Sequence, residues 1–254
     1  MTTMDIINNR VSIRKFNNKP IEDEVLTSIL ESAIKAPTAG NMVPYTILKV
    51  KNSETLEKLS VSCDHQPFIK DADTALIFLV DLYKWHHYLL QNDVKEYAEK
   101  TNRHYDGPTL ADAILAINDA LIASENAVIA AEHYGVGSCY IGDIMENFEY
   151  HRELFELPEY VFPAAMLVLG HYDHRPAPRY RFDTKHVIFE ETYKKLSKDE
   201  LEDMYQEKTK LYNPNVSEEI KNYAQQFYNR KMGADFFVEM NRSLKEILKM
   251  FERP

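Results

Sequence analysis

Apolar residues recur at helical spacing in two long segments of the chain. Residues 21–34 carry apolar side chains three and four positions apart with acidic residues mostly between them, so we expect an amphipathic helix that buries one face. Pro20 suits the first turn, and the Ala36-Pro37 step ends the helix because the residue before a proline is driven out of the helical region. Residues 109–134 predict a second helix, roughly 39 Å long, of the kind that lies in a core or a subunit interface.

Shorter apolar runs predict strands. They lie at residues 45–50, 74–80 and 162–169, with an added edge strand at residues 187–189 and a short helix at residues 54–60. Gly135 and Gly137 end the long helix and lead into a loop at residues 140–142. Because strands alternate with helices along the chain, we expect an α/β or α+β sandwich.

The last part of the chain differs in composition. Beyond Tyr193 the sequence is polar and rich in Lys and Glu, mainly at residues 194–210 and 218–251. These stretches predict helical arms laid over the core, where they embrace a partner subunit or cover the site.

Composition narrows the class of protein. With 254 residues, 44% of them hydrophobic, the chain is long enough to bury one substantial core. The runs at residues 75–80 and 162–169 are much shorter than the roughly 20 residues of a membrane span, and the amino terminus lacks the pattern of a secretory signal. We therefore expect no membrane span and a cytoplasmic protein. Cys63 and Cys139 are too few for a disulfide framework and form no C-x-x-C pair.

Charge is distributed unevenly. The formal net charge of -10 disfavours nucleic acid as a partner, yet residues 10–15 and 179–181 are basic clusters. Arg14 and Arg181 carry planar, permanently charged guanidinium groups and Ser12 adds a hydroxyl, so we expect them to bind one phosphate monoester from two sides. The alternative is that residues 10–15 only end a first helix, where cations complement the helix dipole.

Four motifs follow one another in a characteristic order. They are R-x-S-x-R at residues 10–14, A-P-T-A-G-N at 36–41, Y-I-G at 140–142 and R-x-R at 179–181. Over about residues 5–193 this order resembles the FMN-dependent nitroreductase family, especially its larger nitroreductase and flavin reductase branch.

The resemblance implies an architecture and an assembly. The implied fold is α+β, an α/β/α sandwich with a mainly antiparallel central sheet flanked by helices. Residues 1–193 then form the FMN-binding domain, and residues 194–254 form a helical C-terminal extension packed on the same domain. In similar proteins the long helix forms much of a homodimer interface, and the flavin lies between the two subunits.

The resemblance also implies the residues that hold FMN. They are Arg10, Ser12, Arg14, Thr38, Ala39, Asn41, Gln66, Tyr140, Ile141, Gly142, Arg179 and Arg181. The first basic cluster serves the phosphate, the ribityl chain and the pyrimidine edge, while the second closes the phosphate side. Gln66 lies where relatives place an amide against the pyrimidine, and residues 140–142 lie near the redox-active centre. For Asn41 and Gly142 the alternative is an ordinary turn.

Two departures from the family pattern bear on the site. Residues 42–45 read Met-Val-Pro-Tyr, where many relatives have a Gln before the Pro and a Trp after it. Asp143 stands where the larger branch often has a glycine, so we expect a narrower and more acidic floor beside the flavin. Arg242 in the last helix is a candidate for the phosphate of NADPH, although a surface arginine needs no ligand.

The activity implied by the resemblance is ping-pong hydride transfer. NAD(P)H is the reductant, and nitroaromatics, quinones or free flavin are the acceptors. No catalytic side chain is expected, because the flavin carries the electrons. The sequence leaves open the choice between NADH and NADPH, and three other functions. These are a flavin-binding or storage protein without turnover, a specialised member such as a reductive dehalogenase or a flavin-fragmenting enzyme, and a structural protein with a degenerate site.

No metal site is expected. His86 and His87 are adjacent, so on a helix their side chains point about 100° apart and do not readily share one ion. We interpret them as surface histidines.

Overall fold

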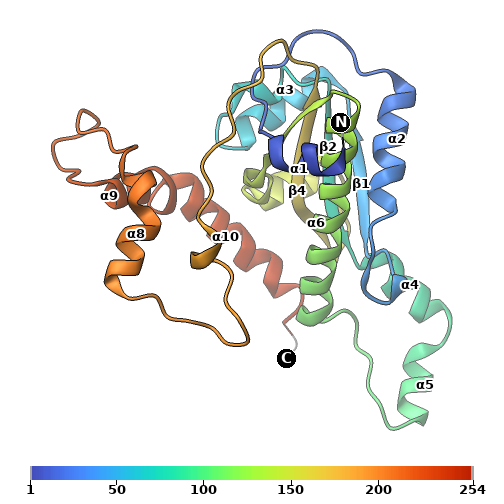
Figure 1. Cartoon of the computed structure of the whole chain (residues 1–254). Helices are drawn as coiled ribbons and strands as arrows, with labels where there is room; N and C mark the ends of the chain where they lie inside the picture. Colours follow the sequence, from blue (N-terminus) through green and yellow to red (C-terminus); the bar gives the residue numbers. More distant parts are fainter. Residues whose placement is uncertain (1, 253–254) are drawn as a thin grey trace. The chain divides into compact units, whose positions relative to one another are not determined.

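An antiparallel sheet of four strands forms the centre of the fold (Figure 1). The strands are β1 (Tyr45–Val50), β2 (Thr74–Asp81), β3 (Gly137–Ile141) and β4 (Val161–Gly170), in the order β1-β2-β4-β3. Every residue of β2 and β4 is buried, as expected for central strands that are apolar throughout. The three strands predicted at residues 45–50, 74–80 and 162–169 and the α+β fold are confirmed.

The computed structural model describes residues 2–252, which divide into two compact units. Of these residues, the first unit comprises 2–176 and 239–252, and the second comprises Ala177–Val238. The boundary between domains that we expect at residue 193 stays a prediction.

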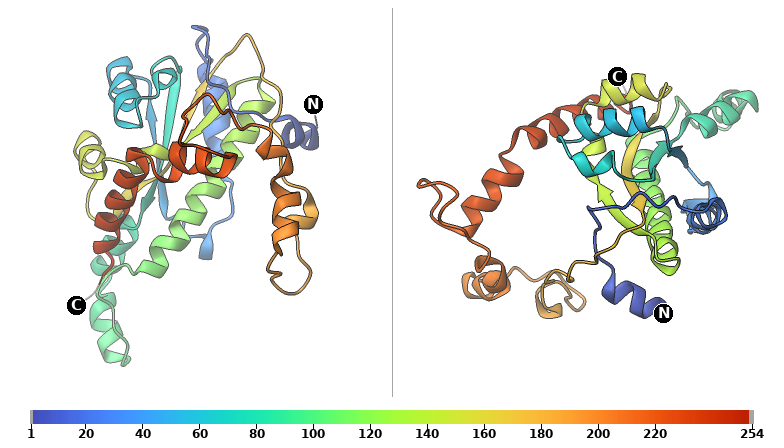
Figure 2. Two further views of the ribbon diagram at one scale, coloured as in Figure 1. Left: turned by 90° about the vertical axis from the view of Figure 1, so that its left-hand side faces the viewer. Right: turned by 90° about the horizontal axis from the view of Figure 1, so that it is seen from above.

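Helices cover both faces of the sheet in the first unit (Figure 2). The helices of this unit are α1 (Thr3–Asn9), α2 (Asp23–Ile34), α3 (Ser53–Ser62), α4 (Tyr83–Gln91), α5 (Val94–Lys100), α6 (Leu110–His133) and α7 (Phe148–Leu154), of which α5 extends away from the sheet (Figure 1). Leu76 and Phe78 of β2 pack in one apolar cluster with α2 and α6. The alternate residues Ala75 and Ile77 pack in a second cluster with α3. This alternation produces the expected α/β/α sandwich.

The long helix α6 has two different faces. Its buried face is rich in alanine, including the fully buried Ala116, Ala120 and Ala127, and packs against α2 and the sheet. By length and composition alone, α6 is the one helix within residues 2–252 that is apolar enough to cross a membrane, a test that core helices of soluble proteins also pass. Its packed face and the buried carboxylate of Asp119 make it the core helix of this unit.

The second unit is mainly helical. It contains η4 (Thr184–His186), α8 (Lys198–Thr209), α9 (Tyr223–Phe227) and the π-helical turn η5 (Tyr228–Met232), while α10 (Asp235–Lys249) leads back into the first unit. The predicted helical content of this part of the chain is confirmed, while its packing over the core stays a prediction. The edge strand that we expect at residues 187–189 is wrong. Val187 and Ile188 donate backbone N–H groups to Thr184 in a turn and are 56% and 65% exposed.

Gly137 opens β3 at a point where two other side chains cross the strand. A Cβ atom on Gly137 would lie 2.6 Å from Tyr172 Cδ1 and 2.7 Å from Ile13 Cγ1. The absence of a side chain at residue 137 therefore lets the segment that contains Ile13 approach β3.

We expect Gly137→Ala to lower the free energy of unfolding by about 1–3 kcal/mol, because the added methyl group overpacks this contact. Urea denaturation of the FMN-free protein at a fixed concentration measures the change. Gly142→Ala is the matched control, since no atom lies within 4 Å of its Cβ position, and we expect it to stay within about 0.5 kcal/mol of wild type. Equal destabilisation by both substitutions would contradict the close approach.

Candidate functional site

The first basic cluster runs alongside β3. Helix α1 ends at Asn9, where the backbone N–H of Arg10 donates to Ile6 O at 2.9 Å. Beyond it the chain is extended, Ser12 forms a parallel bridge with Ser138, and Ile13 N donates to Ser138 O at 2.9 Å. The alternative that residues 10–15 end a helix is therefore wrong, because only Arg10 caps α1. The cluster instead lies beside the strand that leads into residues 140–142.

Tyr140 is held at the end of β3. Its hydroxyl lies 2.7 Å from Ser124 Oγ and donates to Glu125 Oε2 at 3.2 Å, both on α6. Burial is the main cause that raises the pKa of the Tyr140 hydroxyl, while the positive charge of Arg10 acts on it in the opposite direction. Arg10 thus lies within electrostatic reach of the Tyr140 ring.

Gln66 and Arg14 approach the same region from two other segments. Gln66, which follows α3, donates from Nε2 to Asp143 Oδ2 at 2.7 Å and to Cys63 O at 3.0 Å. The guanidinium of Arg14 lies 5.9 Å from the centre of the Phe68 ring. Residues 10–14, 66–68 and 140–143 are far apart in the sequence, yet these contacts place them in one part of the first unit.

Glu146 is a buried carboxyl group beside this cluster. It is 4% exposed, and its Oε1 has no hydrogen-bond partner within residues 2–252. Burial, followed by the charge of the neighbouring Asp143, raises the pKa of Glu146 to about 8. The raised pKa favours the protonated form of Glu146 near neutral pH, in which the carboxyl group can donate a hydrogen bond.

The turn at residues 38–41 is built on a different part of the first unit. Ala39 N donates to Asp119 Oδ2 on α6 at 3.0 Å, and Trp85 Nε1 donates to Met42 O at 2.7 Å. Gly40 and Asn41 have positive φ angles of 58° and 55°, which suit these two residue types. The turn leads into β1 at one edge of the sheet, whereas residues 140–142 leave β3 at the opposite edge. One chain therefore presents the predicted residues as two separate groups.

Arg179 and Arg181 belong to the second unit. They lie in a stretch without regular secondary structure, in which the rings of Tyr180 and Phe182 make an edge contact. Their convergence with Arg14 on one phosphate stays a prediction.

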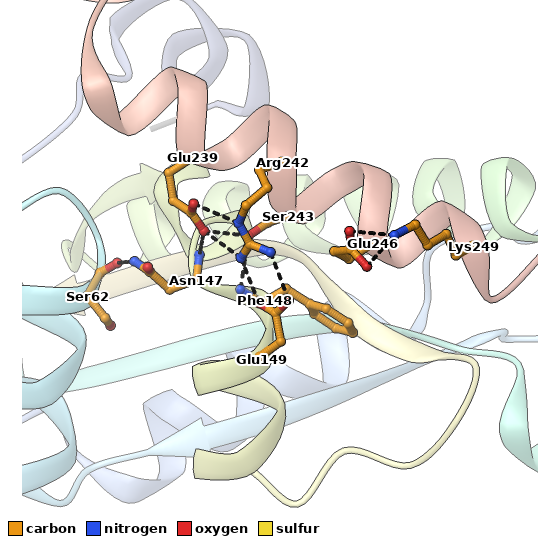
Figure 3. Close-up of polar contacts among 9 residues, drawn as sticks. All are labelled: Ser62, Asn147, Phe148, Glu149, Glu239, Arg242, Ser243, Glu246 and Lys249. Atoms are coloured by element: carbon orange, nitrogen blue, oxygen red, sulfur yellow. Dashed lines mark hydrogen bonds and ion pairs between the residues drawn. The ribbon is translucent and has the colours of Figure 1, made fainter.

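Arg242 on α10 is bound by two carboxylates (Figure 3). Its Nη1 and Nη2 donate to the two oxygens of Glu149 at 2.8 and 2.7 Å, and its Nε and Nη2 donate to the two oxygens of Glu239 at 2.8 Å each. The hydrogen bonds from Arg242 lower the pKa of Glu149 to about 2. In this arrangement the guanidinium is occupied by protein carboxylates and is not presented to the phosphate of a nicotinamide dinucleotide.

The same network caps α7, the helix that follows the Y-I-G segment (Figure 3). Asn147 N donates to Glu239 Oε1 at 3.3 Å, and Phe148 N donates to the buried Ser243 Oγ at 3.1 Å. These bonds satisfy backbone groups that a helix start leaves without partners. The last helix of the chain thus helps to fix the segment immediately after the predicted flavin loop, a role with no recognisable signal in the sequence.

His86 and His87 lie on α4. His86 Nδ1 is 3.0 Å from the Tyr105 hydroxyl, and the two imidazole rings meet edge to face with centroids 5.6 Å apart. Within residues 2–252, no group of three or more His, Cys, Asp or Glu side chains is arranged to hold a metal ion.

Comparison with known proteins identifies the family. A model described as the nitroreductase family matches residues 7–171. This chain belongs to the nitroreductase family. The matched range contains both groups of predicted residues in the first unit and ends before Arg179.

Relatives of this nitroreductase-family chain are similar over most of its length. The FMN reductase [NAD(P)H] of Bacillus subtilis (strain 168) is 33% identical over 192 residues, which cover 75% of this chain and 73% of that protein. The structure of NfrA2 from B. megaterium superposes with a TM-score of 0.79 at 28% identity and covers 100% of both chains. The NADPH:FMN oxidoreductase from Vibrio harveyi, solved with NAD+, shares the fold with a TM-score of 0.78 at 24% identity, covering 97% of each chain.

Several residues of the site could not be predicted from motifs. Phe68, Asp119 and Glu146 contact or support predicted residues but occupy no motif position that we recognised. Asp143 was notable as a departure from the family pattern, and the structure adds its partner, Gln66.

We expect Glu146→Gln to stabilise the FMN-free protein increasingly as the pH rises from 5 to 8. The pKa of Glu146 is about 8 in the folded state against an ordinary value of 4.5, so the folded state binds more protons in this window and wild-type stability falls as the pH rises. Gln keeps the donor toward Asp143 without this penalty, and the relative gain approaches about 2–4 kcal/mol at pH 8.

Urea midpoints at pH 5, 6, 7 and 8 measure this gain. The other charged groups that act on Glu146 are Asp64 and Glu239, besides Asp143, and they are unchanged in the variant. The exposed substitution Glu99→Gln is the control and should give a difference that does not vary with pH. A pH-independent difference for Glu146→Gln as well would contradict the protonated state of Glu146.

Proposed function

We propose that this chain is an FMN-dependent NAD(P)H oxidoreductase that reduces nitroaromatics, quinones or free flavin. Its family and the curated FMN reductase [NAD(P)H] that it resembles support this function. The observation that carries the proposal is the grouping of Arg10, Ser12 and Arg14 with Gln66 beside the end of β3. This group combines cationic, hydroxyl and amide side chains, which are the donors and acceptors that a flavin mononucleotide requires.

The residues of the first unit fit FMN by their chemistry. Arg14 is exposed and makes no ion pair within residues 2–252, so its guanidinium is available to a phosphate. Each charge-assisted hydrogen bond to that phosphate contributes about 1.5–3 kcal/mol. Arg10 and Ser12 serve the ribityl chain and the pyrimidine edge, and Arg179 and Arg181 close the phosphate side.

Turnover follows a ping-pong order, in which NAD(P)H leaves the site before the electron acceptor binds in the same position. Bound FMN would supply the chemistry of hydride transfer between NAD(P)H and the acceptor. The protein's part is to bind the cofactor and to orient it, and Gly142 offers an exposed backbone next to the predicted redox centre. Water supplies protons, so no side chain acts as an obligatory acid or base. The expected cytoplasmic location belongs to the same proposal.

The working form is a homodimer with FMN between the subunits. The outer face of α6 carries large apolar residues that are 41–51% exposed in the single chain: Leu110, Ile114, Leu115, Leu121 and Ile122. At helical spacing they form one stripe opposite the packed alanine face, and such a stripe suits burial against a second copy. A dimer would also bring the turn at residues 38–41 of one subunit to the Gln66 side of the other.

We expect Arg14→Glu to lose FMN. The wild-type protein should purify yellow and bleach under NADPH or NADH, whereas the variant places a negative charge against the phosphate and should bind FMN at least about 100-fold more weakly. Titration of the FMN-free protein with FMN, followed by flavin fluorescence, measures the affinity. Arg103→Glu makes the same charge change in the exposed loop after α5 and should leave the affinity unchanged.

Two results would contradict the proposal at different levels. Unchanged FMN retention in Arg14→Glu would show that the phosphate lies elsewhere. A wild-type protein that stays colourless after incubation with FMN would contradict the proposal that this chain is an FMN-dependent enzyme. Protein that binds FMN but does not oxidise NAD(P)H with menadione or nitrofurazone would instead be a storage protein.

We expect Ile114→Glu to break the dimer, because it places a charge in the centre of the apolar stripe. Sedimentation velocity at micromolar concentration should show wild type as a dimer and the variant mainly as a monomer that retains less FMN. Leu248→Glu, at an exposed apolar position of α10, is the control and should remain dimeric. A dimeric Ile114→Glu variant would exclude this face of α6 as the interface.

A further inference from the structure

The amide group of Gln66 is oriented by the protein. Its Nε2 donates to Cys63 O at 3.0 Å and to Asp143 Oδ2 at 2.7 Å. A primary amide has two N–H groups, so both donors of Gln66 are engaged within the chain. Among residues 2–252, no group donates a hydrogen bond to Gln66 Oε1.

This orientation follows from the partners. A backbone carbonyl only accepts hydrogen bonds, so the atom facing Cys63 O has to be the nitrogen of the amide. A carboxylate oxygen on Asp143 imposes the same choice. Turning the amide over would set its oxygen against two acceptors.

Asp143 is itself held in place. Its backbone oxygen accepts from Glu146 N at 3.0 Å, and the charge of its carboxylate acts on the buried Glu146 side chain. Many similar proteins have a glycine at this position, which offers no such acceptor.

We propose that Asp143 is a positioning residue that leaves the Gln66 carbonyl oxygen as the only hydrogen-bonding atom of that side chain open to a ligand. A site with such an acceptor selects a ring N–H, and the imide N3–H between two carbonyls of the isoalloxazine is the matching group. Gln66 is partly exposed and follows α3, so its oxygen can meet a bound ring. This inference rests on the proposed function.

The test compares FMN with N3-methyl-FMN, which lacks the ring N–H. Dissociation constants are measured by fluorescence titration of FMN-free wild type, Gln66→Met, Asp143→Ala and Asp143→Asn at pH 6.5. We expect wild type to prefer FMN by about tenfold or more, as for a hydrogen bond left without its partner. Gln66→Met retains a similar volume without the acceptor, and its smaller preference gives the steric contribution of the methyl group.

Asp143→Ala should lower the preference toward that of Gln66→Met, because one amide N–H of Gln66 then has no acceptor in the protein and Cys63 O alone holds the orientation. Asp143→Asn keeps an acceptor for Gln66 Nε2 and should stay within about twofold of the wild-type preference. A circular dichroism spectrum of each variant shows that it is folded, and the Asn variant keeps the test informative if Asp143→Ala does not fold.

Two outcomes overturn the inference. If Asp143→Ala keeps the wild-type preference while Gln66→Met loses it, Asp143 does not orient the amide. If Gln66→Met also keeps the wild-type preference, Gln66 does not accept from the ring N–H. Absence of FMN binding to wild type is a separate result, since it ends the proposed function and the inference with it.

Discussion

The pairing of residues 12 and 13 with Ser138 is the constraint on which the site depends. One bridge and one backbone hydrogen bond of 2.9 Å align the basic segment with β3, and Gly137 permits this approach because it has no side chain. The strand positions the Tyr140 hydroxyl against Ser124 of α6 and leads to Asp143, whose carboxylate accepts from Gln66. Without this pairing, the arginines would be an isolated basic patch on an acidic chain.

The sheet distributes the candidate cofactor residues between its two edges. The turn at residues 38–41 is tied to α6 through Asp119 and enters β1, while the Gln66 group gathers at the end of β3. In the proposed homodimer, a second copy packed on the outer face of α6 would bring the two groups of residues into one site. The proposed dimer would then serve the cofactor site as well as the burial of apolar surface.

How far the sequence could predict this structure depended on the type of signal. The strands β2 and β4 were predictable because they are continuous apolar runs, and α2 and α6 because their apolar residues repeat at helical spacing. Strand β3 was missed because Gly137 and Ser138 interrupt the apolar pattern that would have indicated a strand. The edge strand predicted at residues 187–189 was wrong, because the apolar side chains of Val187 and Ile188 are exposed and do not pack in a sheet. The motifs indicated most candidate residues, but the bond between Gln66 and Asp143 joins positions 77 residues apart that no local pattern connects.

The most direct test of the central claim is a crystal structure of the protein with bound FMN. The account predicts one FMN between two subunits, with its phosphate held between Arg14 and Arg181 of one subunit and its ring near Gln66. The turn at residues 38–41 should then come from the other subunit. A structure in which Arg181 lies far from Ser12 with no phosphate between them, or in which one subunit encloses the flavin alone, would contradict it.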